Sequence, residues 1–213
     1  MSRSRTVATT AASLLLAAGL LGACGGDGDE ESGPQETPSA TPTASQSPTA
    51  VETPEARKVK FGKPAKGTRI KGSTYTFRVP DGWLDNTASA REVDSEIDAS
   101  GAESDGADGF RNNVTVTSIV ATGGNLDDLE ADITLQLENV AKKISQEERV
   151  MLAGRPMAHH VGVLKGNPPY HVEQYSGIDE EGRVTVIAFN FAHNTPAKAR
   201  ERSTNAILAS WKW

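Results

Sequence analysis

Few side chains in this sequence could carry out chemistry. Its 213 residues include one cysteine, Cys24, and four histidines, His159, His160, His171 and His193. No serine lies in a Gly-x-Ser-x-Gly turn, and the glycine-rich stretches match neither a phosphate-binding loop nor a dinucleotide fingerprint. We therefore expect no catalytic residues, no cofactor and no enzymatic activity.

The histidines come nearest to forming a metal site. His159 and His160 are neighbours in a segment predicted to be a strand, so their side chains point to opposite faces and cannot share one ion. Either of them could meet His171 or Glu173 across strands, giving a set of two or three ligands. Because no cysteine is free to complete such a set, we expect no metal.

The residues before Cys24 indicate its chemistry. Residues 1–5 carry two arginines and no acid, and an apolar run rich in alanine and leucine follows. This is the pattern of a secretory signal. Leu21-Gly22-Ala23-Cys24 matches the bacterial lipobox, in which the cysteine receives a diacylglyceryl group. We expect cleavage between Ala23 and Cys24, and a lipoprotein anchored through Cys24 to the extracytoplasmic face of the cell membrane.

A retained transmembrane segment is the alternative interpretation of this N-terminus. The uncharged run from residue 6 to residue 26 is about long enough to cross a bilayer. Four acidic residues follow it, whereas a stop-transfer flank carries positive charge. We therefore favour the cleaved and lipidated form. The four are Asp27, Asp29, Glu30 and Glu31.

The mature chain is acidic. Without the two arginines of residues 1–23, 20 of the 22 basic residues remain against 28 acidic ones, and the formal net charge changes from −6 to −8. Nucleic acids and anionic membrane surfaces require basic patches on their partners. We therefore expect no nucleic-acid partner, and contact with the membrane through the lipid at Cys24 alone.

Residues 24–65 are predicted to be a disordered tether. Most of this segment is glycine, proline, serine, threonine, alanine and acid, which cannot bury enough apolar surface to fold. It can serve as a spacer through the cell wall or as a passive linker, and its Ser/Thr-Pro pattern is also typical of glycosylated stalks. The basic run at 57–64 is interpreted as solvated rather than as a partner contact.

Residues 66–213 are predicted to form one domain. Tyr75, Phe77 and Val79 alternate with polar residues and indicate a strand with these three side chains inward. Trp83, just after the Pro-Asp-Gly turn, is expected to close one end of the core. Further strands are indicated at 113–120, 149–153, 157–164, 170–178 and 183–191.

Two helices accompany these strands. Asn125 is a predicted N-cap, and an apolar face at spacings of three and four residues continues from Leu126 to Ile144. Thr195-Pro196 indicates the start of a final helix. Strands in hairpins with few helices predict an α+β fold, an antiparallel β-sheet flanked by helices.

The segment 85–108 is predicted to be an acidic surface loop. Within it, Asp94-Ser95-Glu96-Ile97-Asp98 has the spacing of a calcium-binding loop. Ala99 stands where such a loop needs glycine for its sharp turn, so we do not expect calcium.

The order of these features resembles a known family. A lipobox and a Ser/Thr/Pro tether precede Tyr75-Thr76-Phe77-Arg78-Val79-Pro80-Asp81-Gly82-Trp83, then Leu152-Ala153-Gly154-Arg155-Pro156, and finally Ser210-Trp211-Lys212-Trp213. This resembles actinobacterial cell-envelope lipoproteins of the LpqN type, which in turn look like the PsbP superfamily. The resemblance implies a PsbP-like α/β/α sandwich and a non-catalytic binding or assembly role outside the cytoplasm.

We therefore expect a lipid-anchored lipoprotein whose α+β domain binds a protein or lipid component of the cell envelope, or assists its assembly. The alternative is a carrier of a small apolar ligand or lipid in a pocket between helix and sheet.

Overall fold

The computed structural model describes residues 55–106, 110–120 and 124–213. They contain three helices, α1 (Thr87–Val93), α2 (Leu126–Val140) and α3 (Ala197–Ala209). Their strands are β1 (Arg69–Lys71), β2 (Thr76–Arg78), β3 (Trp83–Asp85), β4 (Ile97–Glu103), β5 (Asn113–Val120), β6 (Ala141–Leu152), β7 (Arg155–Leu164), β8 (Tyr170–Ile178) and β9 (Arg183–Ala192). None of these three helices is both long and apolar enough to span a membrane.

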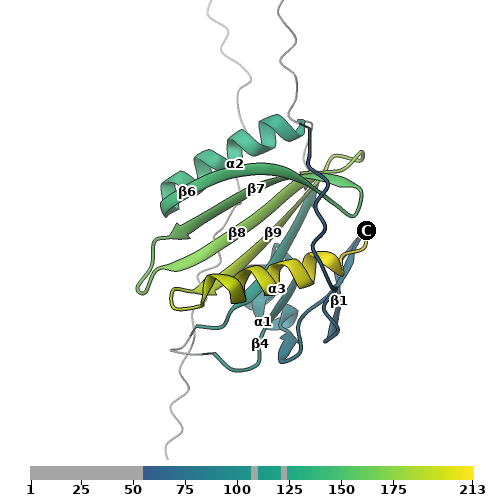
Figure 1. The fold of residues 1–213 in the computed structure, drawn as a ribbon. Helices are drawn as coiled ribbons and strands as arrows, with labels where there is room; N and C mark the ends of the chain where they lie inside the picture. The colour runs from purple at the N-terminus through teal and green to yellow at the C-terminus, as the bar shows by residue number, and fades with distance from the viewer. Residues whose placement is uncertain (1–54, 107–109, 121–123) are drawn as a thin grey trace, which may run out of the picture. The chain divides into compact units, whose positions relative to one another are not determined.

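Seven of the strands form one antiparallel sheet in the order β3-β4-β5-β9-β8-β7-β6 (Figure 1). β1 and β2 pair separately. Short turns join successive strands from β6 to β9, and in the β8–β9 turn Gly182 adopts the left-handed φ of 75° that a side chain disfavours. The predicted α+β fold with an antiparallel sheet is confirmed.

The helices cover both faces of the sheet. On β7, the ring of His160 contacts Thr134 of α2, whereas the neighbouring ring of His159 contacts Glu173. Glu173 in turn accepts a hydrogen bond from Thr204 of α3. Since neighbouring side chains of a strand point to opposite faces, α2 and α3 lie on opposite faces of the sheet.

The main hydrophobic core lies between α3 and the sheet and extends under β1 and β2. Tyr75, Phe77 and Val79 are buried in it, as is Trp83, so the predicted inward face is confirmed. The ring of Trp211 stacks 4.7 Å from that of Tyr75 and 5.1 Å from that of Phe77. Aromatic side chains from the segment after α3 and from the β2 region therefore stack within this core.

Residues 57–65 run along the domain. Arg57 forms a parallel β-bridge with Val150 at the edge strand β6. Farther along, the amide of Ala65 donates a 2.8 Å hydrogen bond to the carbonyl oxygen of Ala206 in α3. The folded part of the chain therefore includes the last residues that we assigned to the tether.

The prediction of an acidic loop over residues 85–108 is wrong for its described part, which contains α1 and β4. Gly101 of β4 packs so closely on the core that a Cβ there would lie 2.6 Å from Val79 Cγ1. Ala99 and Ala102 are also buried. These small residues allow β4 to pack on the core although acidic residues lie beside it in the sequence. Asp98, a candidate calcium ligand, instead accepts hydrogen bonds from the amide and hydroxyl of Ser73.

The predicted helix at residues 126–144 ends four residues early. α2 stops at Val140, and the chain from Ala141 pairs with β7 instead. The helical spacing of Ile144 persists in the sequence, but the hydrogen bonds of the sheet override this local preference. The last helix has Pro196 rather than Thr195 at its N-cap.

Candidate functional site

Two arginines face each other on the outer side of the β1–β2 sheet. The register places Arg69 opposite Arg78 and Lys71 opposite Thr76. The apolar residues that alternate with them are buried in the core. The two-residue period of the strands therefore directs these charged and polar side chains to the solvent.

The C-terminal segment joins this surface. Lys212 forms an antiparallel bridge with Thr76, with backbone hydrogen bonds of 2.8 and 2.9 Å. The hydroxyl of Ser210 accepts a 2.8 Å hydrogen bond from the amide of Arg78. Because residues paired across antiparallel strands share a face, the side chain of Lys212 lies on the face that carries Arg69 and Arg78.

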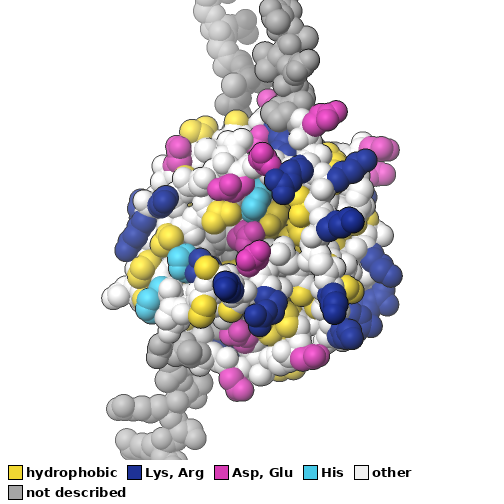
Figure 2. Space-filling view, viewed as in Figure 1, with side chains coloured by type: hydrophobic (Ala, Val, Ile, Leu, Met, Phe, Trp, Pro, Cys, Tyr) yellow, Lys and Arg dark blue, Asp and Glu magenta, His cyan; other side chains and the backbone are white. Residues whose placement is uncertain are grey.

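These segments surround a groove of about 510 Å³, which we call the basic groove. Figure 2 shows many lysine and arginine side chains on the side of the domain where Figure 1 places β1. Four of the described lining residues are cationic and none is acidic. The lining residues are Pro64, Ala65, Lys66, Arg69, Thr76, Phe77, Arg78, Ala209, Ser210, Trp211 and Lys212.

The charges of the basic groove are not compensated within the described part of the chain. The Arg78 guanidinium donates to the carbonyl oxygen of Gly67 at 2.9 Å, and that of Arg69 to the Thr76 hydroxyl at 3.4 Å. None of the four groove cations forms an ion pair with a described Asp or Glu. Like charges directly opposite in a β-ladder destabilise it, so the stability of the fold does not explain the Arg69–Arg78 pair.

This geometry suits an anion. Each guanidinium is a rigid fork of N–H donors that matches carboxylate or phosphate oxygens, and the lysines add positive charge at the edges. The lining of the groove also includes apolar side chains such as Ala65 and Ala209. The groove can therefore hold a molecule with an anionic group and a less polar portion.

A second polar cluster lies between β7, β8 and α3. Glu173 accepts hydrogen bonds from His159 Nε2 at 3.2 Å, from the Tyr175 hydroxyl at 2.6 Å and from the Thr204 hydroxyl at 3.1 Å. Burial alone would raise the pKa of Glu173, but these donors outweigh burial and its pKa is lowered. Burial and the nearby carboxylate raise the pKa of Tyr175, which stays a neutral donor.

This cluster links α3 to strands β7 and β8. An ionised carboxylate with three donors is an acceptor that ties α3 to the sheet. His159 and Glu173 do meet across strands, as considered from the sequence, whereas His171 lies opposite Val163 and Phe191. The described residues contain no group of three or more His, Cys, Asp or Glu side chains that could hold a metal ion.

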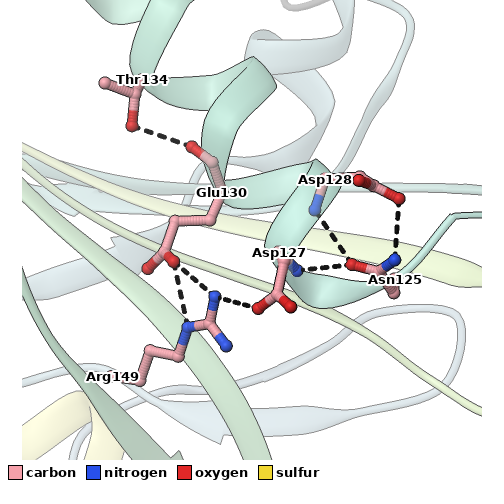
Figure 3. Close-up of polar contacts among 6 residues, drawn as sticks. All are labelled: Asn125, Asp127, Asp128, Glu130, Thr134 and Arg149. Carbon is pink, nitrogen blue, oxygen red and sulfur yellow. Dashed lines mark hydrogen bonds and ion pairs between the residues drawn. The ribbon is translucent and has the colours of Figure 1, made fainter. Parts of the chain in front are cut away.

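Arg149 of β6 joins α2 to the sheet through a buried ion pair (Figure 3). Its Nε donates to Glu130 at 3.0 Å and its Nη2 to Asp127 at 2.6 Å. The Arg149 and Glu130 side chains are only 4% and 8% exposed. The predicted N-cap is confirmed, since Asn125 Oδ1 accepts hydrogen bonds from the amides of Asp127 and Asp128.

His160 is buried beneath α2, next to this ion pair. Its Nε2 lies 2.9 Å from the Thr134 hydroxyl, which donates to the carbonyl oxygen of Glu130 at 2.8 Å. The imidazole must therefore donate through Nε2. Burial lowers the pKa of His160, so the ring is neutral and supports the packing of α2.

The site residues predicted from the sequence, Ala23 and Cys24, lie outside the described residues. The basic groove was not predicted. Alternation over residues 69–78 gave a partial signal, because arginine or lysine occupies three of the four outward positions of these strands and Thr76 the fourth. Only the folded chain brings Lys66 and Lys212 beside those strands.

Comparison with known proteins gives no family for this chain. No protein-family model and no curated protein matches it. Among solved structures it is similar to CyanoP, the cyanobacterial PsbP of Synechocystis sp. PCC 6803, at 12% identity over 68% of this chain and 92% of CyanoP, with a TM-score of 0.46. It is also similar to a protein of Bacteroides thetaiotaomicron, at 12% identity over 69% of this chain, with a TM-score of 0.43.

This chain spans 48% of the Bacteroides protein, about half its length. At such identities and TM-scores the two likenesses carry no argument about function. The functional argument therefore rests on the side chains of this protein.

Proposed function

We propose that this protein is a lipid-anchored lipoprotein of the extracytoplasmic membrane face, with no catalytic activity, whose α+β domain binds an anionic component of the cell envelope. The basic groove is the observation that carries this proposal. Four cations converge there without a described acidic partner, in a chain with more acidic than basic residues. An anionic ligand would supply the missing counter-charge.

The acidic net charge is compatible with this binding. Under physiological salt, interactions between exposed charges are screened over about 8 to 10 Å. A ligand in the groove therefore interacts more strongly with the nearby cations than with the distant acidic residues. The expectation that the domain binds neither nucleic acids nor anionic membrane surfaces rested on net charge alone. We replace it with a local attraction at the basic groove, and the anchor at Cys24 holds the groove in the compartment where envelope components occur.

Carriage of an apolar ligand between helix and sheet is the weaker candidate. The rings of Trp211, Tyr75 and Phe77 stack on one another and are buried in the core, next to residues of α3. The likeness to LpqN-type lipoproteins agrees with an envelope role and remains a prediction from the sequence.

The anchor is tested by Cys24→Ala in the full-length chain. We expect the variant to remain an unlipidated precursor, larger than the mature protein, and to lose the normal lipid-dependent retention in the membrane fraction. Metabolic labelling with a fatty acid and intact mass measure the lipid directly. A Cys24→Ala protein that still carries label and fractionates normally would refute the anchor.

Binding is tested with the mature chain, residues 24–213 with Cys24→Ser, which keeps the domain and tether but lacks the acylated thiol. We expect it to sediment with isolated cell envelopes, with binding that weakens as salt increases. Arg69→Gln with Arg78→Gln should reduce the apparent affinity about tenfold or more. The matched control, Lys142→Gln with Lys143→Gln, removes two exposed charges from β6 outside the groove. Equal loss in both double variants would contradict a site at the groove.

A further inference from the structure

The geometry points to a phosphate ester as the ligand of the basic groove, with its phosphate group held between Arg69 and Arg78. This inference rests on the proposed function and specifies the chemical class of the anion. Carboxylates and phosphates are two common anionic groups, and they differ in shape and in the number of free oxygens. The two arginines distinguish them.

The paired arginines start at adjacent points on one face. The Arg69 guanidinium reaches toward Thr76 and that of Arg78 toward Gly67, so Arg69 has to exchange its 3.4 Å contact with Thr76 for the ligand before both forks can meet one phosphate. Arg69 and Arg78 are direct partners in the β1–β2 register, so their Cβ atoms lie about 5 Å apart on one face. One guanidinium satisfies both oxygens of a planar carboxylate. A tetrahedral phosphate ester offers two or three terminal oxygens in different directions, so two guanidinium groups can contact it together. The pair therefore matches phosphate better than carboxylate.

The surroundings of the pair complete a phosphate site. The Arg78 guanidinium is oriented by its 2.9 Å hydrogen bond to the carbonyl oxygen of Gly67, which leaves other N–H groups free to donate. The Thr76 hydroxyl lies next to Arg69, and Lys66 and Lys212 line the same groove. These cations offset the double charge of a phosphate monoester or the single charge of a diester.

The size of the groove favours an ester over inorganic phosphate. Its volume of about 510 Å³ is that of a site for a small organic molecule rather than for a single ion. Apolar lining at Pro64, Ala65 and Ala209 gives the alcohol portion of the ester a surface to lie on. A polyol phosphate, such as the glycerol phosphate of a lipid headgroup, fits both requirements.

Isothermal titration of the mature Cys24→Ser chain tests this assignment, with glycerol 3-phosphate, inorganic phosphate and succinate as probes. We expect glycerol 3-phosphate to bind about tenfold or more tightly than succinate. Arg69→Lys with Arg78→Lys keeps the charge but replaces both forks, and should weaken glycerol 3-phosphate binding about tenfold. Lys142→Gln with Lys143→Gln should leave it unchanged.

Vesicles distinguish the source of the ester. Sedimentation with phosphatidylglycerol vesicles but not phosphatidylcholine vesicles, competed by glycerol 3-phosphate, would support the inference and assign a lipid headgroup. Binding of glycerol 3-phosphate without vesicle binding would support it and assign a soluble or polymeric ester.

Two results would overturn the inference. The first is that succinate binds as tightly as glycerol 3-phosphate, or that the double lysine variant binds glycerol 3-phosphate as tightly as the wild-type chain does. The groove would then attract anions without selecting phosphate, and the proposed envelope binding would survive. If the wild-type chain binds none of the probes and does not sediment with envelopes, the proposed function fails as well.

Discussion

At the scale of single residues, the arginine pair on β1 and β2 is better explained by the proposed binding than by stability of the fold. Arg69 and Arg78 are opposite each other without a described acidic neighbour, whereas Arg155 pairs with Asp179 at 3.2 Å and lies over the Trp213 ring. Residues that violate a local rule of folding are candidates for function. Substituting Arg69 and Arg155 in turn therefore measures how much each arginine contributes to the free energy of unfolding.

Arg69→Gln should leave the free energy of unfolding unchanged or raise it by about 0.2 to 1 kcal/mol, because it removes a like-charge contact. Arg155→Gln should lower it, since this change removes an ion pair and a ring contact. Urea denaturation of both variants measures the difference. A loss of more than about 1 kcal/mol in Arg69→Gln would mean that this arginine supports the fold.

The Glu173 carboxylate gives the protein a sensitivity to acid. Its pKa in the folded state is lowered below the ordinary value of 4.5, so the ionised group stabilises the fold above that pH. The contribution is lost as the pH falls through the folded pKa, because protonation weakens the hydrogen bonds from His159, Tyr175 and Thr204.

Glu173→Gln should therefore flatten the decline of unfolding free energy below about pH 4.5, the ordinary carboxyl value. At neutral pH it should cost about 1.5 to 3 kcal/mol, since three donors lose a charged acceptor. Denaturation across this pH range, with exposed Glu138→Gln as control, provides the measurement. A parallel shift of the whole curve, without flattening, would disagree with this explanation.

At the scale of elements, Arg149 decides how firmly α2 packs on the sheet. Arg149→Met should destabilise the protein by about 3 to 5 kcal/mol, because Glu130 stays buried without its partner. Adding Glu130→Leu should recover most of this loss. The exposed pair Arg57–Glu148, with side chains 67% and 76% exposed, is the control, and Arg57→Met should cost less than about 1 kcal/mol. Equal losses in Arg149→Met and Arg57→Met would show that burial does not set the strength of this pair.

Elements with clear periodicity could be predicted from the sequence. The strand through Phe77, the Asn125 cap and the strands β8 and β9 follow from alternation and capping. The end of α2 at Val140 could not, because pairing with β7 overrides a helical spacing that continues to Ile144. β4 was missed because most of its buried residues are small and it lies among acids.

The basic groove could be predicted only in part. Alternation places Arg69 and Arg78 on the outer side of their strands, but the sequence does not show that they are opposite each other. The bridge between Thr76 and Lys212 joins positions 136 residues apart in the chain. Contacts at such separation depend on the packing of the core, which local patterns do not specify.

At the scale of the whole molecule, net charge and local charge lead to opposite expectations. The chain is acidic overall, yet four of its cations line one groove. A lipid at Cys24 would hold the protein at the membrane and leave the groove to select its ligand. In the proposed function, the anchor and the groove make separable contributions, one to location and one to recognition.

The most direct measurement is photo-crosslinking from inside the groove in the lipidated, full-length protein in its own envelope. A benzophenone amino acid replaces Thr76, which lies among the groove cations, or Lys142, which is exposed on β6. We predict adducts with an anionic envelope component from position 76, reduced by Arg69→Gln with Arg78→Gln, and none from position 142. No adduct from position 76, or equal adducts from both positions, would contradict binding at the basic groove.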